Sequence, residues 1–199
     1  MAASFSRPGA NVTGIFFDAP EIAGKWLQFL KGLAPELSNV GLLFDENTDD
    51  AQTRAAEDAA KSLRLGTVRL PVRTPEVIPD VLSRAAAAHV DGLLIHSSPI
   101  FVDQAGAISA AALKNKLPSI GLFPINARTG ALLAYGPDNF ALLPQAGMIV
   151  AKVLAGASPA ELPIERPSRF KLVVNITTAQ RLGLEIPPSF LLLADEIVE

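Results

Sequence analysis

The chain has 199 residues, of which 49% are hydrophobic and 19% charged, a composition that excludes an intrinsically disordered protein and indicates a globular one. A net charge of -3, without any cluster of lysines and arginines, excludes the basic surface that binding to nucleic acid or to an anionic membrane requires. The absence of cysteine excludes disulfides and thiol nucleophiles, and the two histidines, His89 and His96, are too few for a histidine metal site.

The first predicted element is an amphipathic helix over residues 21–35. Gly32 and Pro35 favour its end near that point. We expect Trp26 to pack in the core, as large aromatic side chains in such a pattern usually do; the alternative is a contact with a ligand. Five apolar side chains recur at helical spacing and so share one face: Ile22, Trp26, Phe29, Leu30 and Leu33.

A strand, turn and helix pattern then repeats along the chain. Helical spacing is found in residues 50–64, in residues 75–89, which Pro75 opens, and in residues 99–115. Strands alternating with helices of this length predict an α/β fold: a three-layer, Rossmann-like parallel sheet with helices on both faces. Near-continuous apolar runs, typical of strands buried on both faces, occupy residues 39–45, 67–72, 91–97 and 118–123.

The last third of the chain adds further elements. A loop containing glycine and asparagine, residues 124–130, precedes a fifth apolar run at residues 131–136. After a helix over about residues 141–155, the proline-rich residues 157–170 predict a stiff crossing segment rather than a packed element. The chain then offers a strand at 171–175, a short helix at 177–184 and a terminal segment around 191–198.

Several stretches, in their order and spacing over nearly the whole chain, resemble one protein family. They are RPGANVTGI (7–15), LKGLAPELSNVGLLFD (30–45), LPSIGLF (117–123), GALLAYGPD (130–138) and the final stretch LVVNITTAQRLGLEIPPSFLLLADEIVE (172–199). Together they resemble the ABC transporter substrate-binding proteins related to the tryptophan importer, a branch of the type I periplasmic-binding-protein fold. The resemblance implies two lobes that close on a ligand at a hinge and deliver it to an ABC permease.

The resemblance also implies a division of the chain. Residues 1–17 would be a remnant of the N-terminal lobe and hinge, residues 18–136 and 168–199 the C-terminal ligand-binding lobe, and residues 137–167 a crossover helix and linker. Family members usually carry an export signal and most of the N-terminal lobe before RPGANVTG, so we expect this chain to lack both. Residues 1–13 are too polar for a signal-peptide core. For the family, the resemblance implies a periplasmic or lipid-anchored extracytoplasmic location.

The apolar helix at residues 139–156 is expected to have lost its partner. Asp138 or Asn139 is a suitable N-cap for it. In the family this helix would pack on the N-terminal lobe, and an unmatched apolar face tends to be buried by association. We therefore expect a homodimer through residues 139–156, formed by surface contact or by domain exchange.

Candidate binding residues follow from the rule that ligands bind beyond the carboxyl ends of the strands in an open α/β sheet. Hydroxyl and amide groups of Asn47, Ser97 and Ser98 suit a carboxylate or an amine, and the rings of Phe123 and Tyr135 suit an apolar body. The backbone amides that follow Ser98 could also bind an anion. The full candidate set is Asn47, His96, Ser97, Ser98, Phe123, Tyr135 and Asp138.

Four of these candidates also have a simpler structural explanation. Ser97 and Ser98 could cap the following helix, a position at which serine is favoured. His96 could be a satisfied polar residue at a strand end, and it has no evident acid partner for catalysis. Tyr135 could pack at the sheet edge or beneath the hinge.

The turn after the first strand is unusually acidic. The resemblance implies an Asn-Pro type turn here with an asparagine available to the ligand, whereas this chain provides Asn47 two residues after Asp45. A solvated loop at a helix start would account for the acids; the alternative is a preference for a ligand with an amine. The acids are Asp45, Glu46, Asp49 and Asp50.

The sequence therefore favours a non-enzymatic protein. It contains no GxSxG elbow, phosphate-binding P-loop or GxGxxG fingerprint, and we expect neither a cofactor nor a metal. The resemblance implies the solute-binding component of an ABC importer, which binds an amino-acid-like or aromatic or branched carboxylate at the interlobe cleft. The alternatives are a sensory or regulatory domain of the same fold, or a truncated lobe that binds little because it cannot enclose a ligand.

Overall fold

The computed structural model describes residues 2–16, 22–48 and 50–199. Two compact units share these residues: a large unit within residues 20–136 and 171–199, and a small unit within residues 1–19 and 137–170. Glu21, the predicted start of the first helix, and Asp49 of the acidic turn lie outside the described residues.

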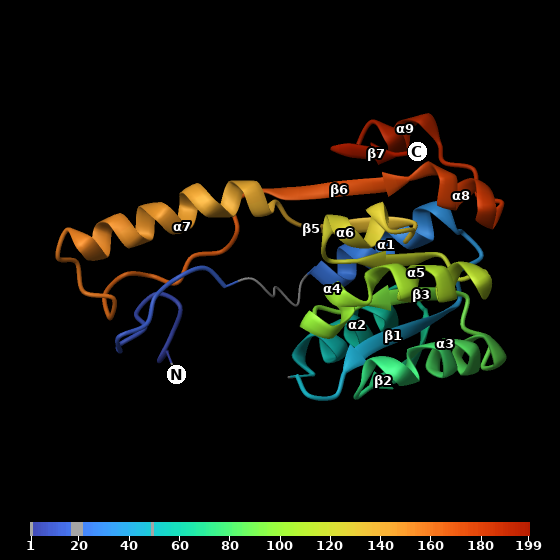
Figure 1. Cartoon of the computed structure of the whole chain (residues 1–199), viewed down its shortest axis with the longest axis horizontal. Coiled ribbons are helices and arrows are strands. Elements are labelled where there is room, and N and C mark those ends of the chain that lie inside the picture. The colour runs from blue at the N-terminus through green and yellow to red at the C-terminus, as the bar shows by residue number, and fades with distance from the viewer. Residues whose placement is uncertain (1, 17–21, 49) are drawn as a thin grey trace. The chain divides into compact units, whose positions relative to one another are not determined.

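The large unit is built on a mostly parallel seven-stranded sheet in the order β2-β1-β3-β4-β5-β6-β7 (Figure 1). The apolar runs become strands because the central ones are buried on both faces: all four residues of β3 are buried. The strands are β1 (Asn39–Asp45), β2 (Gly66–Val72), β3 (Gly92–Ile95), β4 (Ser119–Gly121), β5 (Leu133–Pro137), β6 (Phe170–Asn175) and β7 (Glu196–Val198).

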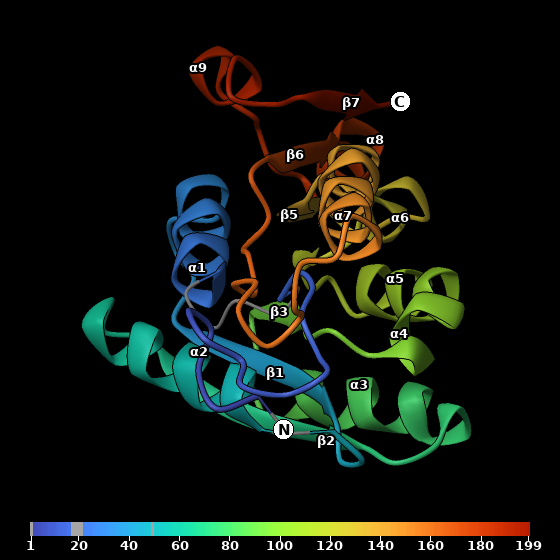
Figure 2. The ribbon, with the colours of Figure 1, turned by 90° about the vertical axis from the view of Figure 1, so that its left-hand side faces the viewer.

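Helices cover both faces of this sheet, which confirms the predicted three-layer α/β fold. Figure 2 shows α1 and α2 on one face and α3, α4 and α5 on the other. The helices are α1 (Ile22–Leu33), α2 (Ala51–Ser62), α3 (Ile78–Ala87), α4 (Pro99–Asp103), α5 (Ala105–Lys114), α6 (Pro124–Arg128), α7 (Asn139–Leu154), α8 (Ile176–Leu182) and α9 (Pro188–Leu191).

The predicted core residues lie where the periodicity placed them. All five side chains of the predicted stripe on α1 are buried, and Trp26 is fully enclosed, which confirms its packing role. On the opposite face one apolar cluster joins the sheet to α3, α4 and α5, through residues that include Leu43, Val72, Leu82, Phe101 and Ile108. The core therefore holds the strand ends in fixed positions.

Three predicted boundaries were wrong. The single helix over residues 99–115 is two helices, because Gln104 (φ -98°, ψ 12°) interrupts it and lets Phe101 and Ile108 enter the same core. The predicted loop at 124–130 contains α6, whose first turn Pro124 starts at a favoured position. Pro75 begins a short 3-10 turn, and α3 follows from Ile78.

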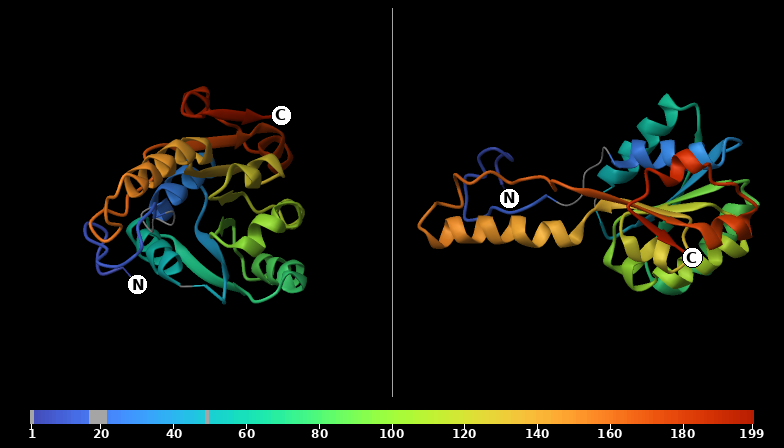
Figure 3. Two further views of the ribbon diagram at one scale, coloured as in Figure 1. Left: turned by 60° about the vertical axis from the view of Figure 1, so that its left-hand side comes forward. Right: turned by 90° about the horizontal axis from the view of Figure 1, so that it is seen from above.

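The small unit consists of α7 and two extended segments (Figure 3). The proline-rich segment, predicted to be a stiff crossing without packing, is in fact paired with the N-terminal segment: Ile15 forms a parallel bridge with Glu165, and the Thr13 hydroxyl donates to the Leu162 carbonyl at 2.9 Å. Prolines have no amide hydrogen to donate, but the amides of Ile164 and Glu165 donate to the carbonyls of Phe5 and Gly14. Buried Gln145 of α7 donates to the Glu165 carboxylate at 2.8 Å.

No helix in the described ranges is both long and apolar enough to span a bilayer.

Asp138 is the N-cap of α7, where its carboxylate accepts a hydrogen bond from the Phe140 amide at 3.0 Å. This confirms the first of the two predicted caps.

Candidate functional site

The candidate site of the large unit lies at the carboxyl edge of β1, β3, β4 and β5. These strands are consecutive neighbours in the parallel part of the sheet, so the loops that follow them open at the same edge. Among the described residues there is no group of three or more histidine, aspartate or glutamate side chains that could hold a metal ion.

Asp45, at the end of β1, is hydrogen-bonded to the loop after β1 and to the loop after β3. The side chain is buried, with 4% exposed; one carboxylate oxygen accepts from the Ser98 hydroxyl at 2.7 Å and the other from the Asn47 amide nitrogens, each at 2.9 Å. Burial works to raise the pKa of Asp45, yet these hydrogen bonds hold the pKa below its usual value. Asp45 is therefore an ionised anchor, and the expectation of a solvated acid at this position was wrong.

Ser98 has both a capping and an anchoring role. Ser98 is the N-cap of α4, where its hydroxyl oxygen accepts a hydrogen bond from the Ile100 amide at 3.1 Å. The same hydroxyl donates a hydrogen bond to the Asp45 carboxylate. Only 2% of the residue is exposed. The predicted capping role is thus confirmed for Ser98, and its hydrogen bonds position the loop after β3 rather than offering a free group to solvent.

Ser97 is placed differently from its neighbour. Its backbone amide donates to the Gln52 side-chain oxygen at 2.9 Å, and the residue is half-buried. Its hydroxyl has no hydrogen-bond partner among the residues that the structure describes. Ser97 therefore combines a fixed backbone with a hydroxyl that is still able to donate and accept.

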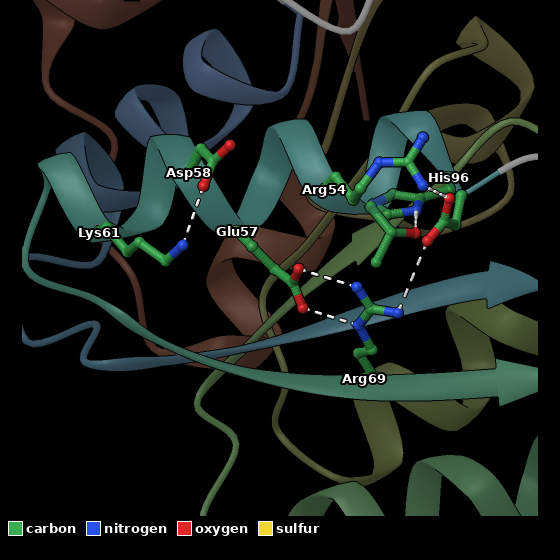
Figure 4. A network of polar contacts seen from close by, with 8 residues as sticks. Arg54, Glu57, Asp58, Lys61, Arg69 and His96 are labelled. Atoms are coloured by element: carbon green, nitrogen blue, oxygen red, sulfur yellow. Dashed lines mark hydrogen bonds and ion pairs between the residues drawn. The ribbon is translucent and has the colours of Figure 1, made fainter.

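His96 is buried between β3 and α2, with 4% exposed. Its Nδ1 lies 3.1 Å from the Thr53 hydroxyl, and its ring centroid lies 6.5 Å from that of Trp26. Figure 4 labels the His96 side chain close to that of Arg54. Its Nε2 has no hydrogen-bond partner within the described chain. Burial lowers the pKa of His96 to about 3, so the imidazole is neutral and supports the loop without a charge.

Asn47 is exposed, but its side-chain amide nitrogen already donates twice. One bond goes to Asp45 and the other, at 3.2 Å, to the Arg73 carbonyl that follows β2. Asn47 thereby links the loops after β1 and β2. Its side-chain oxygen accepts no hydrogen bond within the described residues, so a ligand would bind it as a hydrogen-bond donor.

The exposed acids of this turn are also bound within the chain. Glu46 pairs with Arg73 at 3.1 Å. Asp50 pairs with Arg54 and, at 3.8 Å, with Arg69; Figure 4 labels these two arginines. These basic partners neutralise the described acids that would have attracted an amine. The suggested preference for an amine-bearing ligand therefore has no support at this turn.

Phe123 follows β4 and is half-buried. Its backbone amide donates to the side-chain oxygen of buried Asn126 at 3.0 Å, which fixes the turn into α6. A Cβ atom at Gly121 would stand 2.6 Å from the Asn126 side chain, so glycine is required for Asn126 to reach this position. Phe123 is thus an apolar side chain on a rigid turn at the carboxyl edge.

Tyr135 is half-buried and packs mainly toward α1. Its ring centroid lies 5.1 Å from that of Phe29 in an edge arrangement, and Phe29 in turn lies 5.7 Å from Phe190. Its carbonyl accepts from the Trp26 indole at 2.7 Å. Burial is the main cause that raises the pKa of the Tyr135 hydroxyl, and the negative charge of Asp195 adds to it.

Asp138, by contrast, belongs to the small unit, where its carboxylate caps α7.

The site thus separates into accessible and supporting residues. The sequence pattern predicted Ser97 and Phe123, but it did not predict the supporting roles of Asp45, Gln52, Thr53 and Asn126. For Asp45 a signal was present, because an aspartate at a strand end with a polar residue two positions later is typical of a turn closed by its own side chain. The other three depend on contacts between segments far apart in the sequence.

The chain is similar to one known family and to solved structures. A family model described as "ABC transporter substrate binding protein" matches residues 1–198, and no curated protein gives a significant match. An ABC domain in complex with L-Trp from Streptococcus pneumonia superposes with a TM-score of 0.89 at 24% identity, covering 99% of this chain and 68% of that one.

Two further solved structures share the fold. A conserved domain protein from Vibrio cholerae O1 biovar eltor has a TM-score of 0.89 at 21% identity, covering 98% of this chain and 65% of that one. A ligand-free, open substrate-binding protein with adhesive properties from Clostridium difficile has a TM-score of 0.75 at 22% identity, covering 99% and 66%. The chain spans about two thirds of the length of these structures.

Proposed function

Because the chain belongs to the family of ABC transporter substrate-binding proteins, we propose that it serves an ABC importer as an extracytoplasmic solute-binding component that works with an ABC permease. The family is non-enzymatic, as the sequence led us to expect. In this proposal the large unit is the C-terminal ligand-binding lobe. Residues 1–17 are a remnant of the N-terminal lobe and hinge, and residues 137–167 are a crossover helix and linker that would pack on that lobe.

The proposed ligand is an amino-acid-like or aromatic or branched carboxylate. One observation supports this ligand class: the buried hydrogen bond between Asp45 and Ser98 fixes the loop that carries the free Ser97 hydroxyl. This loop follows β3, and the neighbouring strand β4 leads to Phe123. A hydroxyl suits a carboxylate oxygen and a phenyl ring suits an apolar body. The L-Trp bound by the similar streptococcal domain has both features.

Isothermal titration calorimetry with L-tryptophan, L-leucine and L-lysine tests the ligand class. We expect heat with the first two and little with L-lysine, because the described acids of the β1 turn are already paired. Ser97→Ala should weaken binding about five- to tenfold, the effect of one lost hydrogen bond. Ser62→Ala, at an exposed position at the end of α2, is the matched control. Absence of heat with all three amino acids would contradict the proposed ligand class.

The proposal includes a homodimer through the apolar helix α7. Of the side chains on this helix, Phe140 is 80%, Leu143 71% and Leu154 83% exposed. Exposed apolar side chains gathered on one helix favour association. Sedimentation velocity at micromolar concentration should show a dimer, and a monomer under these conditions would contradict this part of the proposal.

A further inference from the structure

Gln52 lies in the first turn of α2, at the same carboxyl edge of the sheet as Ser97. Helix α2 follows β1, and Ser97 follows the neighbouring strand β3. The Gln52 side-chain oxygen accepts a hydrogen bond from the Ser97 backbone amide at 2.9 Å, and both residues are half-buried. Gln52 therefore belongs to the edge at which the solute is proposed to bind.

This hydrogen bond fixes the orientation of the Gln52 carboxamide. A backbone amide can only donate, so the carboxamide oxygen has to face Ser97, and the nitrogen Nε2 takes the other position. Rotation of the carboxamide by half a turn would set two donors against each other. In a planar carboxamide the nitrogen lies about 2.3 Å from the oxygen, so Nε2 is also held in the neighbourhood of Ser97.

Gln52 Nε2 and the Ser97 hydroxyl are both free to donate. Neither group makes a hydrogen bond within the described residues. The enclosed side-chain polar atoms that lack a partner in the described chain are those of His96 and Gln145, so Gln52 Nε2 and the Ser97 hydroxyl are open to solvent.

The neighbouring side-chain donors are already used inside the protein. The Ser98 hydroxyl donates to Asp45, and the Asn47 amide donates to Asp45 and to the Arg73 carbonyl. Gln52 and Ser97, by contrast, keep donors for a ligand.

We infer that Gln52 and Ser97 together bind the carboxylate of the solute, with Gln52 Nε2 donating to one oxygen and the Ser97 hydroxyl to the other. This inference rests on the solute binding proposed above and adds Gln52 as a determinant of its specificity. A carboxylate has two acceptor oxygens and no donor, so it matches a pair of donors, and its charge strengthens both hydrogen bonds. The strand order β1-β3-β4 leaves Phe123, after β4, for the apolar part of the solute.

The variant Gln52→Glu separates a ligand contact from a positioning role. A glutamate oxygen can still accept from the Ser97 amide, whereas the donor becomes a second charged oxygen that repels a carboxylate. Glutamate is favourable in the first turn of a helix, so we expect urea unfolding to show no loss of stability.

Calorimetry then compares L-tryptophan with L-tryptophanamide, in which a carboxamide replaces the carboxylate. Gln52→Glu should weaken the binding of L-tryptophan about tenfold or more and that of L-tryptophanamide less than about threefold, because a carboxamide can donate to the new carboxylate. Titration in about 1 M salt, where the screening length is about 3 Å, removes the influence of distant charge. L-leucine and L-leucinamide form a second pair of probes.

Gln180→Glu, the same change at an exposed position on α8, is the matched control and should leave the affinity for both ligands unchanged. A loss of equal size for acid and amide in Gln52→Glu would show that Gln52 only positions the loop. That result, or an unchanged affinity for the acid, would overturn this inference and leave the proposed solute binding in place. Absence of heat with L-tryptophan and L-leucine in the natural chain would instead contradict the proposed ligand class together with this inference.

Discussion

Single buried polar residues determine how the carboxyl edge of the sheet is arranged. Asp45 accepts hydrogen bonds from Ser98 and Asn47, and His96 is buried with one ring nitrogen facing Thr53. Buried polar groups lose their water, so their contribution depends on the partners that replace it. At this scale the structure predicts both a stability effect and a pH dependence.

Removal of the Asp45 carboxylate should be costly. Asp45→Ala leaves the donors of Ser98 and Asn47 without their acceptor, and we expect the free energy of unfolding to fall by about 2–4 kcal/mol, since buried hydrogen bonds to a charged group are involved. Urea unfolding measures the change. The control is Asp58→Ala, whose side chain is largely exposed. A loss no larger than that of the control would show that Asp45 is not an anchor.

His96 should make the protein less stable in mild acid. The unfolded chain gains a proton on His96 near pH 6.5, whereas the folded chain resists protonation until about pH 3. The free energy of unfolding is thus highest above pH 6.5 and should fall by up to about 1.4 kcal/mol per pH unit as the pH decreases toward 3. Between pH 6.5 and 4.5, His96→Asn should lose this slope and the exposed-site control His89→Asn should keep it. Equal slopes in both variants would contradict the assignment.

At the scale of elements, the short edge strand β7 depends on one carboxylate. Glu196 accepts two hydrogen bonds of 2.7 Å from Arg128 of α6 and one of 2.6 Å from Lys171 of β6. These bonds lower the pKa of Glu196 to about 2. A strand of three residues has few backbone hydrogen bonds of its own, so this clamp supplies much of what holds it.

Glu196→Gln should release β7 without unfolding the large unit. We expect faster amide hydrogen exchange at β7 and a loss of about 1 kcal/mol, discounted because Arg128 is 46% exposed. In the natural chain this contribution is present above pH 4.5 and is lost as the pH falls toward 2, through the folded pKa. Glu185→Gln, at an exposed position, is the control, and unchanged exchange at β7 would argue against the clamp.

At the scale of the whole molecule, the two units differ in how much apolar surface they bury. The large unit has a core on each face of its sheet, whereas Ile149 is the only buried leucine, isoleucine, valine or aromatic residue among the described residues of the small unit. Burial of apolar surface is the dominant favourable contribution to folding. As a monomer, the small unit should therefore be the less stable of the two.

Two optical probes can separate the units. Trp26, the single tryptophan, lies in the large unit, while the 16-residue helix α7 of the small unit contributes to far-ultraviolet circular dichroism. In dilute protein we expect part of the dichroism to be lost at lower urea than the tryptophan fluorescence. Higher protein concentration should bring the two transitions together, because association stabilises the folded small unit. Coincident transitions at every concentration would show that the units unfold as one.

The sequence by itself determined the α/β class, the alternation of strands with helices in most of the chain, and the buried stripe of α1. These follow from the spacing of apolar residues, which is a local property that burial then enforces. The sequence also contains the motifs that resemble the ABC transporter substrate-binding proteins, and the match to that family confirms the expectation.

Only the tertiary structure decided which polar groups are buried. The sequence predicted Asp45 to be one of four solvated acids, whereas in the structure Ser98 of the loop after β3 contacts it and it is buried. The break at Gln104 is likewise a tertiary feature, because it allows Phe101 and Ile108 to share one core. The exposed side of α7 is likewise defined by the segments that cover its other side. Such outcomes depend on which distant segments meet, and periodicity along the chain does not contain that information.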